Sequence, residues 1–122
     1  MKTEIADKAG FCFGVARAVK IAQRAAEGKD KTVTYGMLIH NRDVTEELKN
    51  LGVGTVESVD EIKSGVNVII RAHGISAAEE SEINNRGAKI IDATCPFVKK
   101  IHTIAAAAAA NGAEVIIVGD PN

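Results

Sequence analysis

Short β-branched runs alternate with longer stretches of helical periodicity along this chain, and this alternation restricts the fold more than any other feature. Residues 66–70 form a continuous apolar run, which is typical of a strand buried on both faces. The other predicted strands cover residues 3–7, 32–36, 54–57, 88–91 and 114–118. Strands that alternate with helices predict an α/β fold, with a mainly parallel sheet and crossover helices on both faces.

Capping residues mark where the intervening helices begin. Asn41 is a suitable N-cap, and Ser58 and Ser76 each start a Ser-x-x-Glu sequence with the spacing of a capping box. Pro96 suits the first position of a helix that continues through six consecutive alanines. The longer predicted helices cover residues 15–25, 42–50, 77–85 and 96–110.

The composition excludes several classes of partner. The 122 residues carry 15 Lys and Arg against 16 Asp and Glu, which gives no support for a nucleic-acid partner. The longest uncharged stretch, residues 101–113, is shorter than the ~20 apolar residues of a membrane span, and no apolar signal core follows the first residues. We expect a cytoplasmic protein that binds neither nucleic acid nor membrane, with two cysteines that form no structural disulfide.

The few residues able to carry chemistry fall between predicted strands and helices. Cys12, His40, His73 and Cys95 each follow a predicted strand and precede a predicted helix, whereas His102 lies inside a helix. In a parallel sheet such junctions share the edge at which ligands bind. Helix N-termini at that edge favour thiolates and phosphates, so an anionic ligand or a metal cluster is expected there.

Simpler interpretations exist for the same residues. An isolated cysteine in an α/β domain is often a small buried apolar side chain. His40 and His73 also suit cap and turn positions, and Lys99 and Lys100 suit a solvated helix face.

Four segments of the sequence have the character of family motifs. They are Ala9-Gly10-Phe11-Cys12-Phe13-Gly14-Val15-Ala16-Arg17-Ala18-Val19, Ile39-His40-Asn41, Arg71-Ala72-His73-Gly74 and Asp92-Ala93-Thr94-Cys95-Pro96. In this order they resemble the motifs of the LytB (IspH) family of 4-hydroxy-3-methylbut-2-enyl diphosphate reductases.

The resemblance implies that this chain is one lobe of a three-lobed, [4Fe–4S]-dependent oxidoreductase of non-mevalonate isoprenoid biosynthesis. Cys12 and Cys95 match two of the three cysteines that hold the cluster, and His40 and His73 match histidines that contact the substrate diphosphate. No catalytic residue of the family pattern lies within this chain. Ferredoxin or flavodoxin is the implied electron donor, and isopentenyl and dimethylallyl diphosphates are the implied products.

The sequence departs from the family pattern by having two cysteines and by stopping where the family continues into a His-Pro-Glu segment. We therefore expect an inactive fragment whose residues 1–95 form a first domain and whose residues 96–122 open a second. As an alternative, residues 1–13 belong not to this first domain but to the missing third domain. The edges that the missing domains would cover also allow self-association.

Two other functional classes stay open. Cys12, Cys95, His40 and His73 supply the donor types of a Cys₂His₂ zinc site, although their spacing lacks a close ligand pair. A non-catalytic α/β binding or assembly module with inert thiols is the other alternative.

Overall fold

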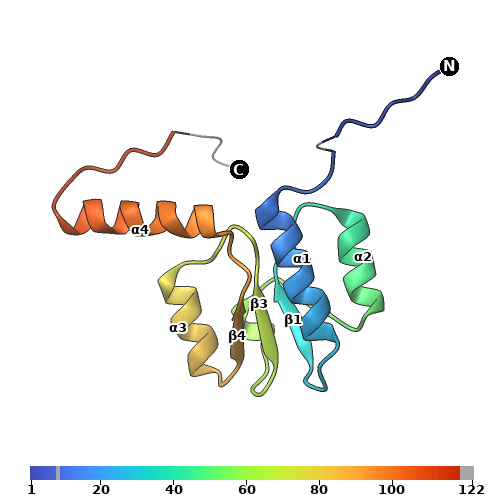
Figure 1. Ribbon diagram of the computed structural model, residues 1–122. Helices are drawn as coiled ribbons and strands as arrows, with labels where there is room; N and C mark the ends of the chain where they lie inside the picture. Colours follow the sequence, from blue (N-terminus) through green and yellow to red (C-terminus); the bar gives the residue numbers. More distant parts are fainter. Residues whose placement is uncertain (8, 119–122) are drawn as a thin grey trace.

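Four parallel strands form the centre of the fold, as the sequence predicts. The computed structural model describes residues 1–7 and 9–118, and its strands are β1 (Thr32–Tyr35), β2 (Gly54–Val56), β3 (Asn67–Ile70) and β4 (Lys89–Asp92). Their order in the sheet is β2-β1-β3-β4 (Figure 1). All three pairings are parallel, so the carboxyl ends of the strands share one edge of the sheet.

Three of the described helices begin at the predicted capping residues Asn41, Ser58 and Ser76. The helices are α1 (Phe13–Ala26), α2 (Arg42–Asn50), the 3-10 helix η1 (Val59–Glu61), α3 (Ala77–Asn85) and α4 (Pro96–Ala110). The Asn41 side chain accepts a hydrogen bond from the backbone N–H of Val44 at 3.1 Å. Both predicted capping boxes are present, at the starts of η1 and α3. Local capping chemistry therefore determines where these three helices begin.

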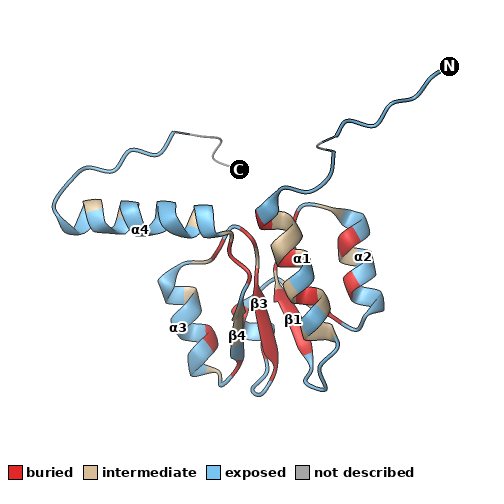
Figure 2. Cartoon of the chain, in the orientation of Figure 1, coloured by how far each residue is buried: buried red, intermediate tan, exposed pale blue. Residues whose placement is uncertain are grey.

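The sheet is covered on both faces, which confirms the predicted architecture. On one face Ile69 packs with side chains of α1 and α2, and on the other Val68 and Ile70 pack with side chains of η1 and α3. All four residues of β3 are buried, and Figure 2 shows the burial concentrated along β1 and β3. Alternate residues of a strand point to opposite faces, so this one strand contributes to both cores.

The first and last predicted strands are wrong. Residues 3–7 and 114–118 adopt no strand, and Ile5, Ile116 and Ile117 are highly exposed. A strand needs a hydrogen-bonded neighbour, and neither segment pairs with another strand within the described ranges. The predicted departure from the family pattern at the end of the sequence involves residues 119–122, which lie outside the described residues.

Helix α4 extends away from the sheet (Figure 1). It contributes no buried residue, and Phe97, Ile101 and Ile104 are exposed on it. Its N-terminal end nevertheless follows β4 after a loop of three residues, 93–95, and so lies at the carboxyl edge of the sheet. No described helix is long and apolar enough to cross a membrane.

Candidate metal and anion site

Both cysteines occupy the N-cap positions of helices. Cys12 precedes α1 and Cys95 precedes α4, and neither side chain makes a capping hydrogen bond. Cys12 is exposed and Cys95 is half-buried, and both are free thiols. A helix N-terminus stabilises the thiolate, which is the form that binds metals.

Cys12 reaches the carboxyl edge by a different route from the predicted one. No strand precedes it, because residues 3–7 are not a strand. Helix α1 instead lies against the sheet and leads into β1, so its first turn lies at the edge where the strands end (Figure 1).

The Cys95 side chain packs against Gly14, in the first turn of α1. A Cβ atom built at Gly14 would lie 2.5 Å from the Cys95 Sγ and 3.0 Å from its Cβ. Gly14 lies within α1 and is buried. Gly14, two residues after Cys12, lacks a side chain and so leaves space for the Cys95 side chain.

Gly14→Ala should destabilise the chain, although alanine normally favours a helix over glycine. The usual gain of about 0.5–1 kcal/mol is outweighed by an overpacking cost of roughly 1–3 kcal/mol, because the Cys95 side chain must move. The free energy of unfolding, measured by urea denaturation, should therefore fall by about 1–2 kcal/mol. In a Cys95→Ala background the clash with Sγ is absent and the loss should shrink. Equal losses in the two backgrounds would contradict the contact.

The two predicted diphosphate ligands lie side by side. The ring centroids of His40 and His73 are 5.2 Å apart, with an angle of 42° between the planes. Both side chains are exposed and line a cavity of about 300 Å³. Its other lining residues are Phe11, Val15, Ile39, Asn41 and Ala72. Among them, Phe11 is the residue immediately before Cys12 in the chain.

Two basic groups, Arg71 and His40, lie near the His73 ring. Burial lowers the pKa of His73 below its usual value, and the charges of His40 and Arg71 lower it further. The Nε of Arg71 is buried and has no hydrogen-bond partner among the described residues. An anion bound here would lower the mutual repulsion of these cationic groups and favour the protonated imidazoles.

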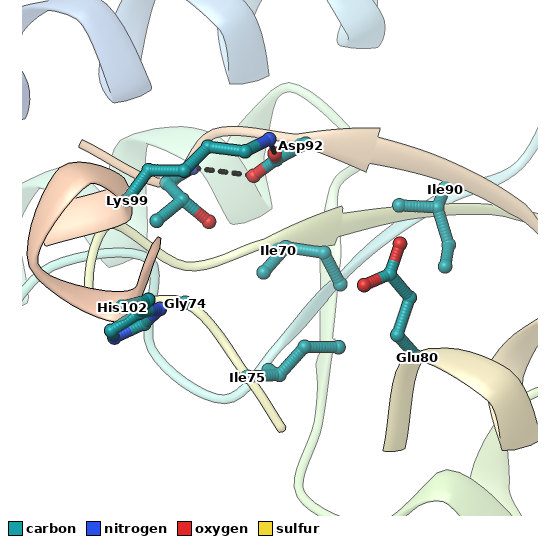
Figure 3. Close-up of a pocket in the computed structure, with 9 residues that line it drawn as sticks. Ile70, Gly74, Ile75, Glu80, Ile90, Asp92, Lys99 and His102 are labelled. Carbon is teal, nitrogen blue, oxygen red and sulfur yellow. Dashed lines mark hydrogen bonds and ion pairs between the residues drawn. The ribbon is translucent and has the colours of Figure 1, made fainter. Parts of the chain in front are cut away.

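The loop before Cys95 is held by a pair of charged residues that the sequence did not single out. The Asp92 carboxylate accepts hydrogen bonds from the Thr94 backbone N–H at 2.9 Å and from the Lys99 Nζ at 2.7 Å. Burial raises the pKa of Asp92, but the bonds from Lys99 and Thr94 outweigh it and the net direction is down. Lys99, predicted as part of a solvated helix face, therefore forms an ion pair (Figure 3).

His102 is exposed on α4, consistent with its predicted place inside a helix, but it also contacts the turn after β3. A Cβ atom at Gly74 would lie 2.9 Å from the His102 Cε1, and the two residues border the cavity drawn in Figure 3. Gly74 has a φ of +79°, which favours glycine. The periodicity of α4 alone contained no signal for this contact, because the contact joins two elements.

The donor set fits part of an iron–sulfur or other soft-metal site. Within the described ranges, no three His, Cys, Asp or Glu side chains are grouped so that they could hold a metal ion. The two thiols and the two imidazoles nevertheless lie on one edge, in the chemical types that suit a thiolate-bound metal and an anion.

Comparisons with known proteins agree with the geometry. The profile of the family described as LytB protein matches residues 3–122. The 4-hydroxy-3-methylbut-2-enyl diphosphate reductase of Aquifex aeolicus is 45% identical over 119 residues, covering 97% of this chain and 41% of that protein. The reductase of the same name from Wolinella succinogenes is 46% identical over 123 residues, covering 100% of this chain and 43% of that protein. The chain thus spans about two fifths of the length of these curated relatives.

Two solved structures show the same fold. One, described as (E)-4-hydroxy-3-methyl-but-2-enyl diphosphate reductase, the terminal enzyme of the non-mevalonate pathway, has a TM-score of 0.84 and 44% identity. It is matched over 98% of this chain and 42% of its own length. The other, E-1-hydroxy-2-methyl-but-2-enyl-4-diphosphate reductase from Plasmodium falciparum, has a TM-score of 0.90 and 29% identity, covering 95% of this chain and 37% of that chain.

Proposed function

Because the chain belongs to the LytB family, we propose that it forms one part of a reductase acting on 4-hydroxy-3-methylbut-2-enyl diphosphate. In the proposed reaction the allylic hydroxyl leaves as water, and a hydrogen is added either at the same carbon or at the other end of the allylic system with a shift of the double bond. Two electrons, from ferredoxin or flavodoxin, and two protons balance the change. The products are isopentenyl and dimethylallyl diphosphates. The observation that carries the proposal is the contact of the Cys95 side chain with the first turn of the helix that Cys12 begins.

Cys12 and Cys95 would hold two irons of a [4Fe–4S] cluster. Both occupy helix N-cap positions, and cysteine side chains are the ligands that hold such clusters. When bound, the cluster supplies redox equivalents and a Lewis-acidic iron for the substrate hydroxyl. A third thiolate would come from another part of the enzyme, since this sequence has two cysteines. Such thiols are retained in a reducing compartment such as the cytoplasm.

His40 and His73 would bind the diphosphate. Their rings lie together beside the positively charged Arg71, which suits a group with several negative charges. Both imidazoles can donate hydrogen bonds to phosphate oxygens. By binding the distant diphosphate they would orient the allylic end of the substrate toward the thiols.

The domain division is also part of the proposal. Residues 1–95 contain the complete sheet, and we assign them to one lobe, while α4 and the residues after it open the next. The absence of buried residues on α4 supports this division, because the helix packs poorly on the sheet. A third lobe would complete the site, and residues 1–13 remain a candidate part of it.

A graft tests the proposed function. In the graft, this chain replaces the matching segment of the Aquifex aeolicus reductase, and both the graft and the 122-residue chain are reconstituted anaerobically with iron and sulfide. We expect the graft to bind a [4Fe–4S] cluster and to reduce 4-hydroxy-3-methylbut-2-enyl diphosphate. The chain alone should hold no stable cluster and show no turnover. A graft without a cluster would contradict the assignment of the thiols, and turnover by the chain alone would contradict the need for further lobes.

A further inference from the structure

The loop that carries Cys95 is held from several directions. On the side of the sheet, the Cys95 backbone N–H donates a hydrogen bond to the Ala72 carbonyl at 2.9 Å, and Asp92 accepts one from the Thr94 N–H. These bonds come from β4 and from the turn that contains His73. They connect the loop to its own half of the site, but they do not connect it to Cys12.

Arg17 makes the connection to the other half. This residue lies on α1, five positions after Cys12, and its Nη1 donates a hydrogen bond to the Thr94 carbonyl at 3.1 Å. The bond is partly buried and spans 77 positions of sequence. It therefore joins the helix that begins after Cys12 to the residue immediately before Cys95.

A second contact closes the same junction. The rings of Phe13, one position after Cys12, and Phe97, two positions after Cys95, meet edge to face with centroids 6.4 Å apart. Both rings are largely exposed, so they contribute less than a buried pair would. Gly14 sets how closely α1 and Cys95 approach, whereas Arg17 contributes the directional polar bond between the two sides.

We propose that Arg17 is a positioning residue that sets the separation of the Cys12 and Cys95 thiols, through its hydrogen bond to the Thr94 carbonyl. The inference rests on the proposed function, in which Cys12 and Cys95 bind a cluster. A cluster needs its thiolates at a set spacing, so a residue that sets this spacing would favour cluster assembly. Arg17 touches neither substrate nor cluster in this role. The guanidinium suits the task, since it is planar and presents several N–H donors in a fixed arrangement.

The test measures the thiol spacing directly in the metal-free 122-residue chain. A bis-methanethiosulfonate with a two-carbon spacer bridges two thiols that lie close together, and intact-mass spectrometry gives the rate of bridging. Labelling with methyl methanethiosulfonate corrects this rate for the reactivity of each thiol. The unmodified chain should be bridged efficiently at low protein concentration.

Arg17→Met should slow the corrected bridging rate by roughly tenfold, as expected for loss of a hydrogen bond from a charged donor. Arg17→Lys should retain part of the rate, because it keeps one donor and the charge. Arg17→Leu, which also lacks a hydrogen-bond donor, is measured alongside, so that a methionine variant that fails to fold does not remove the test. Arg24→Met is the matched control, an exposed arginine two turns later on α1, and should bridge at the unmodified rate.

The outcomes separate this inference from the proposed function. Unchanged bridging in folded Arg17→Leu or Arg17→Met overturns the positioning role, as does an equal decrease in Arg24→Met. The measurement contains no metal, so slower bridging supports the positioning role even where the graft described above binds no cluster. In a graft that does bind it, Arg17→Met should lower the electron paramagnetic resonance signal of the reduced cluster, whereas Arg24→Met should not.

Discussion

Cys12→Ser in the graft should lower the affinity for the [4Fe–4S] cluster by about a hundredfold or more. Substitution of residues that only support metal ligands already costs about tenfold to a hundredfold in affinity, and Cys12 is a proposed ligand itself. Serine is nearly the size of cysteine, but its hydroxyl is a hard donor that stays protonated where a thiol ionises. Cys12 is exposed at the helix N-cap and makes no capping hydrogen bond, so the fold should lose little by the exchange. Loss of the cluster, together with an unchanged melting temperature of the metal-free graft, is therefore the expected pair of results.

Iron and sulfide analysis after anaerobic purification measures the cluster content. Ser81→Ala is the control, since it alters a hydroxyl on the exposed side of α3, away from both thiols. Cys95→Ser should behave as Cys12→Ser does in cluster content, with an additional change in stability because Cys95 is half-buried against Gly14. A Cys12→Ser graft that keeps its full iron content would remove this thiol from the proposed donor set.

Ile69→Ala should cost about 2–5 kcal/mol of the free energy of unfolding. Ile69 lies in β3, between β1 and β4, and its side chain is fully buried against α1 and α2. Removal of its outer carbons loses apolar burial and leaves a cavity among side chains that cannot collapse into it. A domain of this size should then melt about 10 °C lower or more.

Thermal and urea denaturation measure the loss. Ile69→Val should cost about 0.5–1.5 kcal/mol, because it removes one methylene rather than three carbons. Ile104→Ala on α4 is the matched control, because Ile104 is 58% exposed and should change stability by about 0.5 kcal/mol or less. Similar losses for Ile69→Ala and Ile104→Ala would contradict the central position of β3 in the core.

Most of the secondary structure was predictable because its signals are local. The bounds of α2 match the prediction, since Asn41 caps the first turn and Gly52 has the left-handed φ that follows a helix end. The strands at residues 3–7 and 114–118 were wrong for the opposite reason. Their side chains have strand character, but a strand forms only with a neighbour, and no local pattern records whether one is present.

The candidate site divides in the same way. The sequence alone determined which thiols and imidazoles the chain has, and it located three of them after strands of a parallel sheet, where the backbone pattern brings them to one edge. Only the tertiary structure decided that Gly14 makes room for Cys95 and that Arg17 bonds to the Thr94 carbonyl. These contacts join residues about 80 positions apart, and they depend on how a helix lies across a sheet. Sequence periodicity describes single elements, so the packing between elements has to be seen in three dimensions.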